Sequence, residues 1–180
     1  MICALTGMDI ANASMYDGAT AIAEAAILSC THTDRSLVII DKNLNPAYKQ
    51  VLNTYLTARN IKISEQDVLK LNCTADTAGV IIQNPNFLGD ILDLNGVADK
   101  THAAGALLIM AYDPIAQGIL KTPAEWGADI AVGEGQALGN PISFGGPALG
   151  LFAAKKELQR LMPGRIIGQT KDIEGKNGYV

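Results

Sequence analysis

The chain has 180 residues, of which 48% are hydrophobic and 18% are charged. This balance predicts one folded domain, residues 1–180, with a substantial buried core, and it argues against a disordered chain. The net charge of −4 and the scattered distribution of the 14 lysine and arginine residues argue against binding to nucleic acid, which requires clustered cations.

The first part of the chain predicts helices and strands in alternation. Asp17 is a capping residue in front of the alanine-rich segment "GATAIAEAAILSC", which favours a helix. The apolar run Arg35–Asp41 predicts a buried strand. Asn45 and Pro46 open a second helix, "AYKQVLNTYLTARN", because proline suits the first helical turn. The segment Ile61–Ser64 is a weaker strand candidate.

The middle of the chain predicts two further strands around a long helix. The strands are the apolar runs Gly79–Pro85 and Ala106–Asp113. Between them, Leu88–Ala104 carries apolar residues at helical spacing. Gly105 follows this segment and is placed to stop the helix, since glycine adopts the left-handed conformation common after a helix end.

The last third predicts two strands, a helix and a hairpin. Ala128–Gly133 and Leu149–Lys155 are apolar runs typical of buried strands. The segment "KKELQRLM" predicts a helix that ends before Pro163 and Gly164. The final residues have the rhythm of a hairpin, with a turn near Glu174–Gly178.

The predicted fold class is α/β. The main strand candidates are apolar throughout rather than alternating, which predicts burial on both faces of a mainly parallel sheet. Aromatic residues make up only 5% of the chain, which favours close-packed helices on a sheet over a β-sandwich. In open parallel sheets, ligands bind beyond the carboxyl ends of the strands, so the segments that fall there are the candidate sites.

Two short segments of this kind each allow a structural and a functional interpretation. Gly18, Ala19 and Thr20 open a predicted helix, where free backbone N–H groups either seat a phosphate or are simply capped by Asp17. Asp113 closes a strand before a proline. Its carboxylate either pairs with the ring nitrogen of pyridoxal phosphate or caps the following turn.

A glycine-rich segment, "GADIAVGEGQALGNPISFGGPALG", forms the third candidate. It is interpreted either as a cofactor loop or as a structural loop tightened by glycines. It contains neither a dinucleotide fingerprint nor a P-loop in the required register. Glu134 is the one carboxylate of the glycine loop that follows the strand part of this segment, either a hydrogen-bond acceptor or a solvated side chain. No lysine occurs between Lys121 and Lys155.

Other reactive residue types suggest no site. Cys3, Cys30 and Cys73 lack C-x-x-C spacing, so we expect thiols in a reducing cytoplasm and neither a disulfide framework nor a metal site. His32 and His102 fall at predicted helix ends, where we expect surface positions or interactions with the helix dipole. The apolar runs are too short to cross a bilayer, so no membrane partner is expected.

Two long segments resemble one family over the whole length of the chain. "LTGMDIANASMYDGATAIAEAA" and "GADIAVGEGQALGNPISFGGPALGLFAAKKELQRLMPGRIIGQT" are similar to the glycine cleavage P-protein, glycine dehydrogenase (decarboxylating). The similarity is strongest to subunit 1, the α-type subunit of split bacterial enzymes. The resemblance implies the large domain of a pyridoxal-phosphate-dependent transferase of the aspartate aminotransferase type, fold type I, with three αβα layers.

The resemblance also implies a reaction and its partners. The family decarboxylates glycine with pyridoxal phosphate and passes the aminomethyl group to the lipoyl arm of the H-protein. In split enzymes the Schiff-base lysine belongs to subunit 2, and subunit 1 keeps the fold and lines that active site. The expected partners in the cytoplasm are therefore subunit 2, in a heterotetramer, and the lipoylated H-protein, with no cofactor bound covalently to this chain.

Carried over residue by residue, the resemblance implies a limited site. Gly18–Thr20 match the segment that seats the cofactor phosphate, and Asp113 lies at or next to the position of the ring-nitrogen partner. Gln136 falls near the position of the Schiff-base lysine, and Asn140 follows in the same loop. Because glutamine has no nucleophilic amine, we expect no catalytic residue here and a cofactor site that is vestigial or faces the partner.

Two alternatives stay open. One is a free-standing pyridoxal-phosphate lyase or aminotransferase, for which Lys155 and Lys156 are the nearest lysines, and the other is a scaffold without contact to an active site. The family begins before and continues after this chain. We therefore expect a large domain truncated at both ends and inactive alone, whose exposed edges favour self-association.

Overall fold

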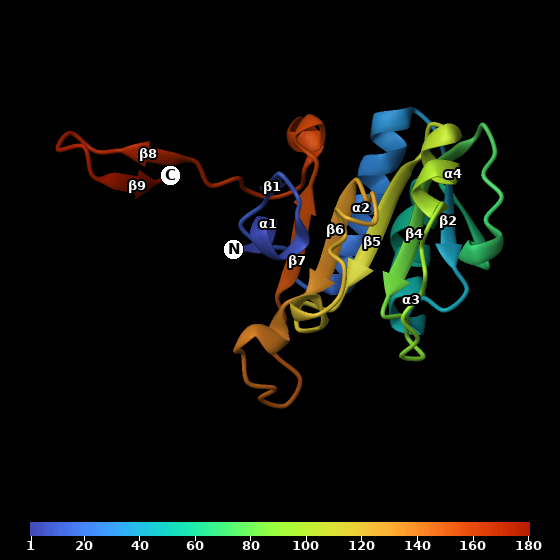
Figure 1. The fold of residues 1–180 in the computed structure, drawn as a ribbon, viewed down its shortest axis with the longest axis horizontal. Helices are drawn as coiled ribbons and strands as arrows, with labels where there is room; N and C mark the ends of the chain where they lie inside the picture. The colour runs from blue at the N-terminus through green and yellow to red at the C-terminus, as the bar shows by residue number, and fades with distance from the viewer.

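A seven-stranded mixed sheet forms the centre of the structure, which a computed structural model describes for residues 1–180. Its strand order is β1-β7-β6-β5-β4-β2-β3, and helices cover both of its faces (Figure 1). The strands of this sheet are β1 (Ile10–Ala11), β2 (Leu37–Asp41), β3 (Lys62–Gln66), β4 (Thr77–Asn84), β5 (Leu107–Tyr112), β6 (Ile130–Glu134) and β7 (Gly150–Ala154). The α-helices are α1 (Ile2–Thr6), α2 (Gly18–Thr33), α3 (Pro46–Thr57) and α4 (Val97–Ala103).

Helices α2 and α3 cover one face of the sheet. Asp17 caps α2 as predicted: its carboxylate accepts a hydrogen bond from the Thr20 N–H at 2.7 Å, and the Thr20 hydroxyl accepts one from the Asp17 N–H at 3.3 Å. Small residues are frequent among the buried positions of α2, and they let the helix lie close to β4. A Cβ added at Gly79 in β4 would lie only 2.6 Å from Ser29 Oγ of α2. The fully buried alanines of α2 are Ala21, Ala23, Ala25 and Ala26.

The other face is covered by α1, α4 and the segments around them. Successive residues of the central strands alternate between the two faces, as strand geometry requires. In β5, Ile109 packs on the α2 side, and Leu108 and Met110 pack on the α4 side, near Val97 of α4. The result is three layers with two apolar cores, one on each face of the sheet.

The strand candidates of the sequence are all confirmed, including the weaker one, which is β3. The parallel direction is confirmed for β2 to β6 but wrong for β7, which runs antiparallel to both β6 and β1. A parallel neighbour requires a long crossover, usually a helix, and the chain between β6 and β7 contains only a loop and one short 3₁₀ turn. Because β7 is buried on both faces, its composition cannot reveal its direction.

The helix predicted over Leu88–Ala104 is wrong in its first half, since α4 begins only at Val97. The side chain of Asn86 accepts hydrogen bonds from two backbone N–H groups of this segment, at 2.9 and 3.0 Å. The side chain of Asn84 accepts a third at 3.0 Å. These bonds satisfy donors that a helix would otherwise use, so the segment stays a loop. The stop at Gly105 is confirmed, with a φ of +70°.

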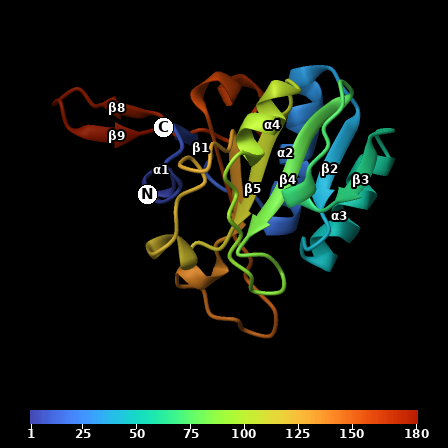
Figure 2. The same cartoon turned by 45° about the vertical axis from the view of Figure 1, so that its right-hand side comes forward.

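The ends of the chain hold further differences. The segment after β7 forms a 3₁₀ helix, η4 (Lys156–Leu161), in place of the expected α-helix. The short α1 and β1 carry no strong sequence signal and were not predicted. The expected hairpin is confirmed by β8 (Gln169–Lys171) and β9 (Asn177–Tyr179), which stand away from the main sheet (Figures 1 and 2). No helix combines the length and the hydropathy needed to span a membrane.

A buried carboxylate joins four elements at the edge of the sheet where β6 begins. Asp129, whose side chain is 5% exposed, accepts a hydrogen bond from Lys155 Nζ at 2.5 Å. Its other oxygen accepts one from the Leu108 N–H at 2.7 Å and lies 2.8 Å from His102 Nε2. His102 does lie in the last turn of α4, but its contact with Asp129 was not predicted. The carboxylate thus connects α4, β5, β6 and the end of β7.

We expect Asp129→Asn to lower the free energy of unfolding by about 2–3 kcal/mol, because a neutral amide cannot satisfy the cationic and backbone donors around it. Denaturant unfolding measures this change. Asp76→Asn is the matched control, since Asp76 is exposed and forms no side-chain hydrogen bond or ion pair. A loss equal to that of the control would contradict the structural role of Asp129.

Candidate functional site

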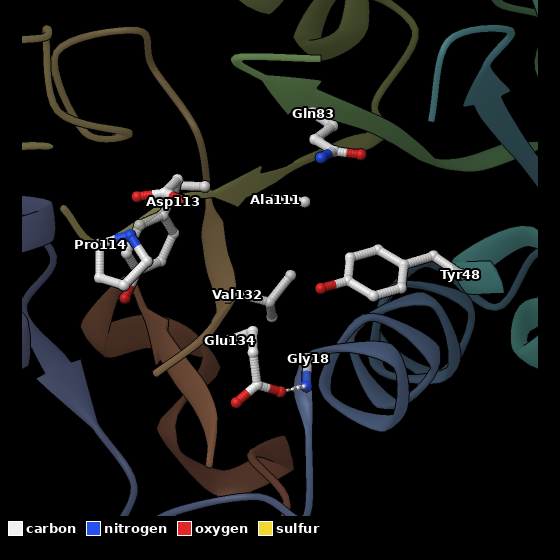
Figure 3. A pocket seen from close by; sticks show the side chains of 10 residues that line it. Gly18, Tyr48, Gln83, Ala111, Asp113, Pro114, Val132 and Glu134 are labelled. Carbon is white, nitrogen blue, oxygen red and sulfur yellow. Dashed lines mark hydrogen bonds between the residues drawn. The ribbon is translucent and has the colours of Figure 1, made fainter. Parts of the chain in front are cut away.

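The carboxyl ends of the parallel strands surround a small cavity of about 90 Å³. Figure 3 shows Tyr48 of α3 and Gln83 of β4 pointing toward it from one side, with Asp113 and Glu134 on the other. Gly18, the first residue of α2, also lines the cavity. The topology therefore brings together Gly18 and Asp113, two of the predicted site residues, beyond the strand ends as expected for this fold class.

The helix start predicted as a phosphate seat is already occupied by protein groups. The Gly18 N–H donates to Glu134 Oε2 at 2.9 Å, and the Thr20 N–H donates to Asp17. The structure therefore supports the simpler interpretation of Thr20, as half of a capping box. Only Gly18 of the three predicted residues Gly18, Ala19 and Thr20 lines the cavity.

Asp113 lies at the mouth of the cavity and caps a turn. Its Oδ1 accepts hydrogen bonds from the N–H groups of Ile115 and Ala116, at 2.8 and 3.0 Å. This is the turn-capping interpretation of the Asp-Pro sequence. Asp113 is exposed, so its second oxygen is accessible from solvent.

Glu134, at the end of β6, is the most connected side chain of the site. Its Oε2 accepts from the Gly18 N–H, and its Oε1 accepts from the N–H groups of Gln136 at 3.0 Å and Leu149 at 2.8 Å. One carboxylate thus binds α2, the start of the glycine-rich loop and the residue before β7. Of the two interpretations that the sequence left open, the hydrogen-bond acceptor is confirmed.

The glycine-rich loop projects beyond this edge of the sheet, below the strands in Figure 1. Gln136 opens the short 3₁₀ helix η3 (Gln136–Leu138), and its side-chain amide donates to the Asn140 carbonyl. The Asn140 N–H donates back to the Gln136 carbonyl at 3.0 Å. A second cavity, of about 280 Å³, lies between Gln136 and the Gly145–Gly146 turn, and Glu134 lines both cavities.

Tyr48 and Gln83 also line the cavity and were not predicted from the sequence. Gln83 interrupts an apolar strand near its carboxyl end, which is a usable signal for a residue facing a site. Tyr48 comes from α3 and is brought to the cavity only by tertiary packing. Burial raises the pKa of the Tyr48 phenol, and the negative charges of Glu134, Asp17 and Asp113 raise it further.

The residues around the cavity do not fit a phosphate-bearing cofactor. No lysine or arginine lines either cavity, whereas Glu134 and Asp113 supply negative charge. The first cavity is far smaller than the roughly 300 Å³ at which small-molecule sites begin. Lys155 pairs with Asp129 at the opposite edge of the sheet, so it cannot reach the cavity, and Lys156 follows it there.

Comparisons with known sequences find similarity to one protein family over the whole chain. The model of the family "Glycine cleavage system P-protein" matches residues 1–180. The probable glycine dehydrogenase (decarboxylating) subunit 1 of Desulforamulus reducens is 54% identical, over 100% of this chain and 42% of its own length. The same-named protein of Moorella thermoacetica is 49% identical, over 100% of this chain and 43% of its own length. The chain therefore spans less than half the length of these relatives.

Solved structures confirm the expected fold class. A crystal structure of glycine decarboxylase (P-protein) of the glycine cleavage system, in inhibitor-bound form, is 44% identical with a TM-score of 0.93; the match covers 100% of this chain and 42% of that one. Cystathionine gamma-lyase from Lactobacillus plantarum, complexed with L-serine, is only 17% identical, with a TM-score of 0.72 and coverage of 89% and 43%. This more distant likeness concerns the fold alone.

The raised pKa of two phenols, Tyr48 and Tyr112, predicts how stability depends on alkaline pH. Burial is the main cause for both. The folded state keeps these protons at a pH where the unfolded chain has lost them, so the free energy of unfolding falls as the pH rises above the ordinary tyrosine value of 10.0. Each phenol contributes at most about 1.4 kcal/mol per pH unit.

We expect Tyr48→Phe to make this alkaline decline shallower, as measured by denaturant unfolding at several pH values. Tyr16→Phe is the control, because Tyr16 is 86% exposed. If Tyr48→Phe unfolds with the same pH dependence as the unsubstituted chain, the Tyr48 phenol does not titrate as its surroundings indicate.

Proposed function

The chain belongs to the glycine cleavage system P-protein family, and on this basis we propose that it forms the cofactor-free large domain of subunit 1 of a glycine dehydrogenase (decarboxylating). In this proposal, subunit 2 carries pyridoxal phosphate in a cytoplasmic heterotetramer. The enzyme decarboxylates glycine and passes the aminomethyl group to the lipoyl arm of the H-protein. This chain holds the glycine-rich loop against the active site of subunit 2.

The main support for this role is that the cavity at the carboxyl ends of the strands lacks the cationic side chains that a pyridoxal phosphate site requires. The cavity lies where a sheet of this class binds ligands, yet no cation lines it and no lysine reaches it. The Gln136 amide is bound within its own loop, so it orders the loop rather than reacting. These features suit a chain that completes an active site held by another subunit.

Exposed apolar side chains at the same edge support a partner surface there. They come from three different loops, after β4, β5 and β6, and such clustering is typical of a protein interface. Phe144 is fully exposed and lies in the glycine-rich loop. The other members are Phe87, Leu88, Ile91, Ile115, Ile119, Leu138 and Ile142.

Two other functions make different predictions. A free-standing pyridoxal-phosphate lyase or aminotransferase requires an anchoring lysine, and borohydride would fix the cofactor to Lys155 or Lys156. The ion pair of Lys155 with Asp129 argues against it. A scaffold without contact to an active site would tolerate any change in the glycine-rich loop.

We expect Gln136→Ala and Asn140→Ala, in a full-length subunit 1 that carries this sequence, to reduce glycine–bicarbonate exchange with subunit 2 by about tenfold. The first removes the amide that orders the loop, and the second removes a side chain of the loop that the proposal places against subunit 2. Gln50→Ala, on the exposed side of α3, is the matched control. Unchanged exchange rates for both loop variants would favour the scaffold instead.

Replacement of an apolar residue at the proposed interface tests the contact itself. We expect Ile142→Glu to weaken binding to subunit 2 by about 30-fold, since a central apolar contact contributes about 2 kcal/mol. Leu161→Glu is the matched control, because Leu161 is partly exposed in η4, at the opposite edge of the sheet. Sedimentation or calorimetric titration measures the affinity, and equal losses in both variants would contradict this placement of the interface.

A further inference from the structure

We propose that the Glu134 carboxylate is a built-in anion, which fills the backbone cradle at the start of α2 and excludes phosphate-bearing ligands from this chain. Phosphate monoesters, including phosphorylated pyridine cofactors, are the excluded class. The inference deepens the proposed function and rests on its statement that another subunit holds the cofactor.

The hydrogen-bond donors at the start of α2 are almost all in use. A helix start offers unpaired N–H groups that attract anions. Here the Gly18 N–H donates to Glu134 Oε2 at 2.9 Å, the Thr20 N–H to Asp17 Oδ1 at 2.7 Å, and the Ala21 N–H to the Asp17 carbonyl at 3.0 Å. Only the Ala19 N–H has no partner within the chain. The Ala19 N–H alone cannot give a phosphate the several hydrogen bonds that a phosphate site at a helix start provides.

The local charge and the limited space also disfavour phosphate binding at the start of α2. The carboxylates of Glu134 and Asp17 both lie at the cradle, so a dianionic phosphate would meet two like charges without a compensating cation. The space beside the Gly18 Cα is also narrow. A Cβ added there would lie 2.6 Å from the Tyr48 hydroxyl oxygen and 3.1 Å from Glu134 Cβ.

The second oxygen of Glu134 explains why a carboxylate suits this position. It accepts bonds from Gln136 and Leu149, the two ends of the glycine-rich loop, at 3.0 and 2.8 Å. A glutamine has one acceptor oxygen and could not serve both this pair and Gly18. The same side chain therefore closes the anion cradle and fixes the loop.

The experiment measures binding of inorganic phosphate to the full chain and to two variants, Glu134→Ala and Glu134→Gln. The amide shifts of Gly18 and Ala19 in ¹⁵N NMR spectra report the site and the affinity. We expect no phosphate-dependent shift in the unsubstituted chain and a clear one in both variants, a gain in affinity of about tenfold or more. A like charge leaves the cradle in both variants, and in Glu134→Ala the Gly18 N–H also becomes free. Glu24→Gln is the matched control, since it removes the same charge from the same helix without freeing a backbone donor.

Three results would overturn the proposal. One is an unchanged affinity for phosphate in a variant whose spectrum shows it to be folded. Another is an equal gain in Glu24→Gln, which would indicate a general charge effect. The third is a phosphate-dependent shift of the Gly18 amide in the unsubstituted chain, a measurement that does not depend on any variant folding. Since subunit 2 takes no part, the outcome is independent of whether the glycine exchange assay succeeds.

Discussion

The antiparallel pairing of β6 with β7 is the contact on which the site depends. The ladder runs from Ile130 opposite Ala154 to Glu134 opposite Gly150. At one end Asp129 binds Lys155, and at the other Glu134 binds the residue that precedes β7. With both ends fixed by a carboxylate, the glycine-rich loop between the strands has little freedom where it leaves the sheet, and its outer part faces solvent.

Most of the fold could be predicted from the sequence because burial leaves a strong pattern. Apolar runs located each central strand, and Asp17 located the start of α2. The wrong predictions have two physical causes. Either a contact between residues apart in sequence determines the local structure, or the local sequence is equally compatible with two structures. Asn84 binds the loop that follows β4 by a contact over eight residues, and a doubly buried β7 gives no sign of its direction.

The candidate site could be predicted less well than the fold. The sequence placed Asp113 and the start of α2 near a common edge, since topology alone determines that edge. It could not show that Glu134 turns back toward Gly18, a contact across 116 residues, nor that Tyr48 enters from α3. The sequence shows directly that a lysine is missing. Only the three-dimensional structure shows that the Glu134 carboxylate lies at the start of α2.

The small residues of α2 determine more than packing. Ala21, Ala23, Ala25 and Ala26 are all fully buried, and those that meet the sheet let the helix lie close to the strands. This distance decides whether the first N–H of the helix reaches the end of β6. A larger side chain at Ala25 or Ala26, about two turns along α2, would lift the helix and separate Gly18 from Glu134. The geometry of the cradle therefore depends on side chains that take no part in its hydrogen bonds.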